Sequence, residues 1–166
     1  MNAATVGDTV QDGIRWRVEQ GIGTITLERP ERANAIGLAA SHALTRAIHA
    51  VLDAAPRVVL LRGTGKIFCA GGDIEEFVAA GDGIDTLVER ILEPLHPAIE
   101  RLGEAPMPVV SALNGAIGGA GIGVALCADF VLAAASMKLR TGYAAIGLSP
   151  DAGASYFLSR RIGSER

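Results

Sequence analysis

Alternation of apolar and polar side chains near the start of the chain predicts a β-hairpin. Two alternating stretches, Ile14-Arg-Trp-Arg-Val18 and Thr24-Ile-Thr-Leu27, are separated by the turn Gly21-Ile-Gly23. Residues 1–12 are polar and carry no such pattern, so we expect a flexible leader there. The folded core is therefore predicted to run from residue 13 to residue 166.

Helical periodicity begins beyond this hairpin. Apolar residues recur at helical spacing between Leu38 and Leu52, which predicts an amphipathic helix, and the apolar run 57–61 is typical of a buried parallel strand. The remaining predicted elements are a short helix over 75–80, a longer helix over 86–102 interrupted around Pro94 and Pro97, strands over 108–113, 129–133 and 137–140, and a helix from about Ser155. Helices alternate with strands, which predicts a mixed α/β fold with a largely parallel sheet.

A cluster of glycines interrupts this pattern between residues 114 and 123. It follows the apolar strand 108–113 directly and precedes the helical run Val124-Ala-Leu-Cys-Ala128. Glycine is costly inside regular structure, so a cluster of it indicates unusual dihedral angles or a close backbone approach. We expect a strand-to-helix turn whose free N–H groups can donate to an anion or a polarised oxygen.

Three other interpretations of this segment compete. A dinucleotide-binding fingerprint starting at Gly119 requires a sixth-position glycine, where the chain has Val124. A membrane span over the uncharged residues 105–128 is disfavoured because prolines, Asn114 and the glycines divide that run. Close packing of a helix on a strand, without chemistry, stays open on this segment alone.

Composition narrows the class of protein. A chain of 166 residues suits one domain, and 20% charged residues with 49% hydrophobic residues are typical of a globular protein. A net charge of −3 and only 4% aromatic residues favour neither a nucleic-acid nor a membrane partner. The N-terminus does not have the pattern of a signal peptide, so we expect a cytoplasmic protein in which Cys69 and Cys127 are buried and reduced.

A second glycine-rich turn follows the strand 57–61. The loop 62–73 ends in Cys69-Ala-Gly-Gly-Asp73, and it lacks the glycine and Ser/Thr positions of a phosphate-binding P-loop. Two backbone N–H groups from separate turns, aimed at one point, form an oxyanion hole. Such a hole stabilises charge developing on a carbonyl oxygen by a few kcal/mol per donor.

These motifs, taken in order, resemble the crotonase (enoyl-CoA hydratase/isomerase) superfamily. The resemblance rests on Phe68-Cys-Ala-Gly-Gly-Asp-Ile74, the segment 108–121, Cys127-Ala-Asp129 and Glu28-Arg-Pro-Glu-Arg-Ala-Asn-Ala-Ile36, and it extends from about Trp16 to the last residue. It implies a crotonase-like ββα superhelix core and a homotrimer or hexamer for the complete enzyme. Further helices follow this core in the family, so we expect a chain that is incomplete at its C-terminus and exposes apolar surface.

The resemblance also implies roles for individual positions. The oxyanion donors of the family fall on the backbone N–H groups of Gly72 and Ala120. The coenzyme A contacts fall on Ala70, Asp73 and Ile74 for the adenine part and on Arg32 and Ala33 for the pantetheine and phosphates. Coenzyme A would arrive within an acyl-CoA thioester substrate, so no separate cofactor and no metal is implied. An alternative for Asp73 is the N-cap of the following helix.

The two glutamates that hydratases of this family use as acid and base correspond here to Gly123 and Tyr143, which disfavours water addition. Asp151 resembles the aspartate with which isomerase members, including ring-epoxide phenylacetyl-CoA and dienoyl-CoA isomerases, move a proton. An alternative for Asp151 is a cap of the last helix.

Other chemistries of the family remain open. Aryl-CoA dehalogenases combine an aspartate at the Asp151 position with a histidine at the position of His96 and an aromatic residue at that of Tyr143. His96 is otherwise a packed or exposed residue beside Pro97. A thioester hydrolase relative using Asp151, or an acyl-CoA-binding subunit without catalysis, are the remaining alternatives.

Overall fold

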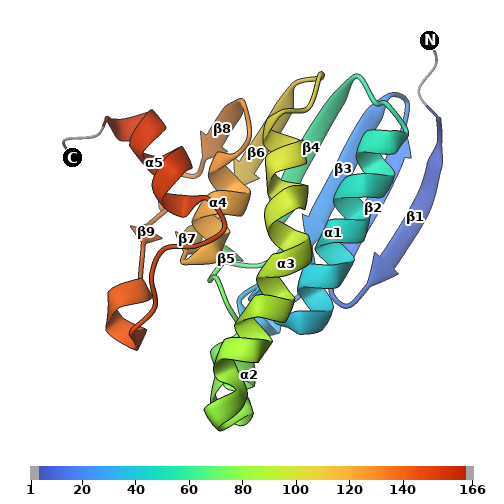
Figure 1. Ribbon diagram of the computed structural model, residues 1–166. Coiled ribbons are helices and arrows are strands. Elements are labelled where there is room, and N and C mark those ends of the chain that lie inside the picture. The colour runs from blue at the N-terminus through green and yellow to red at the C-terminus, as the bar shows by residue number, and fades with distance from the viewer. Residues whose placement is uncertain (1–3, 164–166) are drawn as a thin grey trace.

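Two β-sheets organise residues 4–163, the part of the chain that the computed structural model describes (Figure 1). The strands of the larger sheet, in their order across it, are β1 (Val6–Gln11), β2 (Ile14–Glu19), β3 (Ile22–Leu27), β4 (Val58–Gly63), β6 (Val109–Leu113) and β8 (Phe130–Ala133). The pairings β1–β2 and β2–β3 are antiparallel, and those from β3 onward are parallel.

The smaller sheet pairs β5 (Ile67–Cys69), β7 (Ala116–Gly118) and β9 (Leu139–Arg140), all in parallel. Each of its strands follows a strand of the larger sheet after a short connection, and helices follow each strand pair. The helices are α1 (Leu38–Asp53), α2 (Ile74–Ala80), α3 (Ile84–Gly103), α4 (Ala120–Leu126) and α5 (Ala154–Ile162), with 3-10 turns at Pro30–Arg32, Gly81–Gly83 and Tyr143–Ile146. The predicted mixed α/β fold with a mostly parallel sheet is confirmed.

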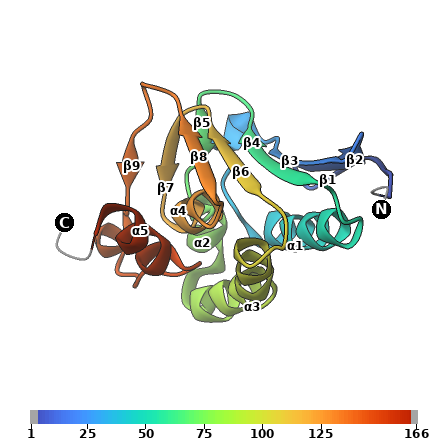
Figure 2. The ribbon, with the colours of Figure 1, turned by 90° about the horizontal axis from the view of Figure 1, so that it is seen from above.

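The core lies between the larger sheet and the helices α1 and α3, which run side by side over one of its faces (Figure 2). The apolar stripe of α1 is fully buried there, including Leu44, Ile48 and Val51. Burial of each such side chain contributes about 1.5–3 kcal/mol. Among residues 4–163, no helix has both the length and the apolarity to cross a membrane.

The N-terminal segment corrects one expectation. Residues 6–11 are not a loose leader, because they form β1 and pair with β2 in an antiparallel ladder; residues 1–3 lie outside the described part. β1 is an edge strand whose side chains are mostly exposed, and an ion pair of 2.8 Å joins Asp8 to Arg15. An edge strand needs little apolar surface, so hydrophobic periodicity does not reveal it.

Helix α3 corrects a second expectation, since it continues without interruption through Pro94 and Pro97. A proline inside a helix removes a backbone hydrogen bond and costs about 3 kcal/mol. Both prolines lie away from the buried stripe of α3, which includes Ile91, Leu95 and Ile99. Packing of that stripe offsets the cost, because tertiary burial outweighs local propensity.

The glycine-rich segments also contain more regular structure than expected. Ile67–Cys69 lies within the predicted loop and forms β5, while α4 begins at Ala120 and not after the glycines. Exposed apolar side chains are present as expected: Phe130 and Leu132 on the edge strand β8 are 60% and 66% exposed.

Candidate active site

The segment 33–36 runs beside the segment 70–73 and is joined to it by backbone hydrogen bonds. Ala70 N–H donates to the Ala33 carbonyl at 3.1 Å, and Ile36 N–H donates to the Gly71 carbonyl at 2.8 Å. Asp73 N–H closes the pairing by donating to the Ile36 carbonyl at 3.3 Å. This pairing fixes the turn that contains Gly72.

Asn34, for which the sequence motifs indicate no role, holds this region together. Its side chain is buried; Oδ1 accepts from Arg29 N–H at 2.8 Å, and Nδ2 donates to the carbonyls of Thr64 and Ile67 at 3.0 and 2.8 Å. Asn34 and its neighbour Ala33 both have positive φ angles. Asparagine tolerates this conformation and hydrogen-bonds to nearby backbone in turns, so an asparagine within the turn 29–34 was the sequence signal that pointed to this role.

Asp73 is buried and forms an ion pair with Arg32. Arg32 Nη2 donates to Oδ1 and Oδ2 of Asp73 at 2.8 and 3.0 Å, and Arg32 Nη1 contacts Glu75. Asp73 is the N-cap residue of α2, as the alternative for it predicted, although its side chain makes no cap hydrogen bond. The pair ties the turn before α1 to the start of α2.

Gly72 and Ala120 carry the predicted oxyanion donors. Neither N–H donates to a backbone carbonyl within residues 4–163, so both remain open for a ligand oxygen. Gly119, with φ 45° and ψ −131°, adopts a conformation that only glycine takes easily and turns the chain from β7 into α4 at Ala120. At Gly72 a Cβ would lie 2.5 Å from the Phe77 ring, so a larger residue there would require that ring to move.

Both donor residues line one cavity of about 250 Å³. Its walls are mostly apolar and come from α2, α3 and the 3-10 turn after β9. The predicted site residues that line it are Ala70, Gly72, Ile74, Ala120, Tyr143 and Asp151. Four others lie outside this lining: Arg32, Ala33, Asp73 and His96. The oxyanion turns and the candidate acid, far apart in sequence, therefore share a single apolar space.

Asp151 points its carboxyl group at Tyr143, whose hydroxyl donates to Oδ1 at 2.8 Å. Burial raises the pKa of Asp151, and the hydrogen bond from Tyr143 partly offsets that rise. Burial, together with the neighbouring carboxylate, also raises the pKa of Tyr143. The N-cap of α5 is Gly153, and no side chain caps that helix, so the alternative in which the Asp151 side chain is a helix cap is wrong.

Gly123, the position of a hydratase glutamate, lies buried in α4 against the Asp151 turn. A Cβ there would overlap the carbonyl oxygen of Ala152 and lie 2.7 Å from its carbonyl carbon. The backbone that carries Asp151 therefore occupies the space that a side chain at position 123 requires.

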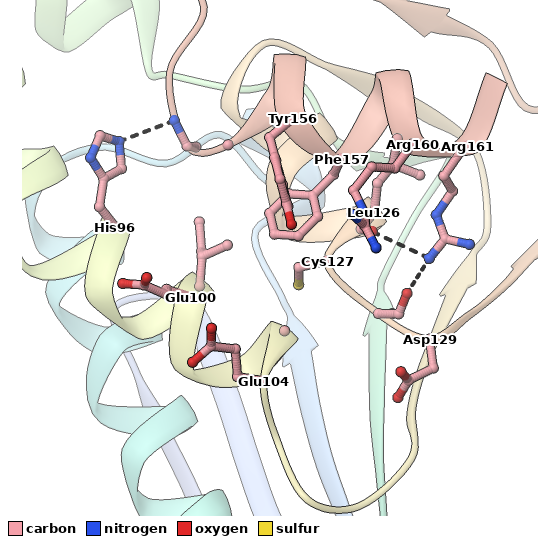
Figure 3. Close-up of a pocket in the computed structure, with 15 residues that line it drawn as sticks. His96, Glu100, Glu104, Leu126, Cys127, Asp129, Tyr156, Phe157, Arg160 and Arg161 are labelled. Carbon is pink, nitrogen blue, oxygen red and sulfur yellow. Dashed lines mark hydrogen bonds between the residues drawn. The ribbon is translucent and has the colours of Figure 1, made fainter. Parts of the chain in front are cut away.

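His96 belongs to a different surface. It is exposed on α3 and lines a larger hollow of about 940 Å³ between α3, α4 and α5, where Glu100 and Glu104 lie across from Arg160 and Arg161 (Figure 3). Its Nε2 accepts a hydrogen bond of 3.0 Å from Ala152 N–H. His96 thus contacts the backbone next to Asp151 without lining the cavity of that carboxylate.

Comparison with known proteins identifies the relatives of this chain. A protein of Rhodobacter capsulatus named as a probable enoyl-CoA hydratase is 41% identical over 153 residues, or 92% of this chain and 58% of that protein. The 1,2-epoxyphenylacetyl-CoA isomerase of Escherichia coli K12 is 38% identical over 90% of this chain and 58% of that enzyme. The crystal structure of an enoyl-CoA hydratase from Polaromonas sp. JS666 matches with a TM-score of 0.81 at 34% identity, covering 92% of this chain and 60% of that one.

The chain spans about 58% of the length of these curated relatives. The relatives carry both hydratase and isomerase names. The family model described as enoyl-CoA hydratase/isomerase matches residues 17–166, nearly the whole chain. This chain belongs to the enoyl-CoA hydratase/isomerase family.

Proposed function

We propose that the protein is an enoyl-CoA isomerase in which Asp151 moves a proton along the acyl chain. The observation that carries the proposal is the single apolar cavity lined by Asp151 and by both candidate oxyanion donors, Gly72 and Ala120. The substrate is an acyl-CoA thioester whose carbonyl oxygen lies between the two N–H groups.

The reaction balances with one carboxylate. Asp151 removes a proton from the carbon next to the thioester carbonyl of a 3-enoyl-CoA, and negative charge develops on the carbonyl oxygen, where the N–H groups of Gly72 and Ala120 stabilise it. Asp151 then returns the same proton two carbons further along, so the double bond moves into conjugation. No electron leaves the substrate, so the step requires neither a redox cofactor nor a metal.

The environment of Asp151 suits this role. Burial raises the pKa of the carboxyl group, which makes the carboxylate a stronger base. The Tyr143 hydroxyl keeps one carboxylate oxygen in a fixed position by donating to it. The second oxygen is the one available to the substrate.

Water addition fits the site poorly. Gly123 and Tyr143 stand where a hydratase of this family has its glutamates, and the Ala152 backbone fills the space beside Gly123. The dehalogenase-like alternative is disfavoured because His96 does not line the cavity with Asp151. The family resemblance further leads us to propose that coenzyme A is contacted by Arg32, Ala33 and Asp73. It also leads us to propose that the complete enzyme assembles as a trimer or hexamer.

The test is Asp151→Asn, assayed with 3-enoyl-CoA thioesters and with the ring epoxide of phenylacetyl-CoA, the substrate class named for the Escherichia coli relative. We expect a loss of turnover of at least 100-fold with substrate affinity retained, because Asn keeps the shape but cannot accept the proton. Asp82→Asn, on the exposed turn before α3, is the matched control and retains full activity. Full activity of Asp151→Asn would remove the proposal. Binding of acyl-CoA without turnover by the unchanged protein would favour the non-catalytic subunit.

A further inference from the structure

The turn that carries Asp151 contains a backbone conformation that is unfavourable for its residue. Ala152 has a φ of 49°, in the left-handed region that residues with a side chain rarely adopt, and it is 1% exposed. Such a conformation persists only where the surrounding structure holds it, and it is frequent at functional sites. The groups that hold Ala152 therefore also determine where Asp151 lies.

Both polar groups of Ala152 lie against residues on other helices. Its carbonyl oxygen lies against Gly123 of α4, in space that any side chain there would fill. Its N–H donates to His96 Nε2 on α3 at 3.0 Å, and the dashed line from the His96 ring to the backbone nitrogen before α5 in Figure 3 marks this bond. Nε2 of His96 is the acceptor of this bond.

We propose that His96 is a positioning residue, which keeps the Asp151 carboxylate in the cavity by accepting the hydrogen bond of the Ala152 N–H. This inference rests on the proposed function, in which Asp151 is the group that moves the proton. It assigns His96 no contact with the substrate.

The connection between the two residues is one peptide unit. The N–H of Ala152 and the carbonyl of Asp151 belong to the same planar group, so the bond to His96 fixes the plane from which the Asp151 side chain departs. Tyr143 holds mainly the far end of that side chain, because its hydroxyl is 2.8 Å from Oδ1 and reaches the Asp151 carbonyl oxygen only at 3.5 Å. With Tyr143 alone, the hydroxyl and the carboxylate can shift together, whereas catalysis requires the carboxylate to stay within about 0.5 Å of its place.

Burial makes the role of His96 specific. Ala152 is almost fully buried, so a leucine that covers its N–H in place of His96 would leave that N–H without an acceptor. The turn would then rearrange to expose that N–H, and the Asp151 carboxylate would move with it. A displacement of about 1 Å at a reacting group lowers turnover by about 100-fold.

The experiment compares His96→Leu, which keeps bulk but removes the acceptor, with His96→Gln, whose side-chain oxygen reaches about as far as Nε2. We expect His96→Leu to lower kcat for the 3-enoyl-CoA by about 10- to 100-fold with KM changed less than 2-fold, because His96 lies outside the substrate cavity. His96→Gln is expected to restore kcat to within about 3-fold of the unchanged protein. His42→Leu, at an exposed histidine of α1, is the matched control for a histidine-to-leucine change.

A second measurement needs no substrate. Amide exchange followed by NMR is expected to show about 10-fold or greater loss of protection at Ala152 in His96→Leu and retained protection in His96→Gln.

The outcomes separate this inference from the proposed function. Unchanged kcat and unchanged Ala152 protection in His96→Leu would overturn the positioning role. His96→Gln as inactive as His96→Leu, with Ala152 protection retained, would also overturn it, because the imidazole would then act chemically. If Asp151→Asn is fully active, the proposed function fails, and the Ala152 exchange data still decide whether His96 holds the turn.

Discussion

Replacement of Gly123 by alanine tests how tightly the Asp151 turn is packed against α4. The added Cβ would overlap the Ala152 carbonyl oxygen and lie 2.7 Å from the carbonyl carbon, where ordinary contact begins at about 3.4 Å. Both atoms are backbone, so no side chain can rotate away. The oxygen is closer to the added Cβ than the carbon is, so the turn must move by more than about 1 Å.

The magnitude follows from opposing terms. Alanine gains about 1 kcal/mol over glycine inside a helix. Overpacking of a buried site costs about 1–3 kcal/mol, and movement of the turn weakens the bonds from Ala152 N–H to His96 and from Tyr143 to Asp151, worth about 1 kcal/mol each. We expect Gly123→Ala to lower the free energy of unfolding by about 2 kcal/mol.

Urea unfolding followed by the fluorescence of Trp16, the single tryptophan, measures this change. Gly103→Ala is the matched control, because the Cβ added at the end of α3 would meet the Phe157 ring at an ordinary 3.5 Å. That variant is expected to be as stable as the unchanged protein or up to about 1 kcal/mol more stable. Equal stability of the two variants would refute the packing argument.

Three further predictions concern titration, strain and thiol burial. Burial raises the pKa of Asp151 in the folded state, so the protonated carboxyl favours folding at low pH, and this contribution is lost as the pH rises. Urea melts of Asp151→Asn should therefore show a gain in stability at pH 7 that disappears near pH 3. Ala55 is exposed with a φ of 50°, so Ala55→Gly should stabilise the folded protein by about 0.5–1 kcal/mol. Ala79→Gly, in an exposed turn of α2, should destabilise it by a similar amount. Thermal melts that give the same sign for both variants would contradict this. Burial raises the pKa of Cys69 and of Cys127 to about 12, so neither thiol should react with a thiol reagent at pH 8 until urea unfolds the protein, and rapid labelling of the native form would contradict that burial.

Hydrophobic patterning predicts those elements of the fold that bury one face. The hairpin of β2 and β3 and the helix α1 follow from their periodicity, because their apolar side chains pack into the core. β1 and the path of α3 through its prolines do not follow, since an exposed edge strand needs no apolar pattern and tertiary packing outweighs the local preference of proline.

The candidate site is predictable where it depends on motifs and not where it depends on contacts between distant backbones. The motifs around Gly72, Ala120 and Asp151 do meet in one cavity. The bond from Ala152 to His96 and the filled space beside Gly123 involve main-chain atoms. Residue types do not indicate which partners main-chain atoms contact. The sequence left His96 either as a reacting group or as a packed or exposed residue beside Pro97, and did not indicate that it bonds a backbone N–H.

The order of strands in both sheets bears on how the protein is made. From β1 to β8 in the larger sheet, and from β5 to β9 in the smaller one, each strand lies beside the strand synthesised before it in that sheet. A chain emerging from the ribosome, N-terminus first, can therefore extend both sheets at a free edge without inserting a strand between two that are already paired. The turns of Gly72 and Ala120 precede Asp151 in the chain, so during biosynthesis the segment that carries the proposed acid comes last and can pack onto turns that are already present.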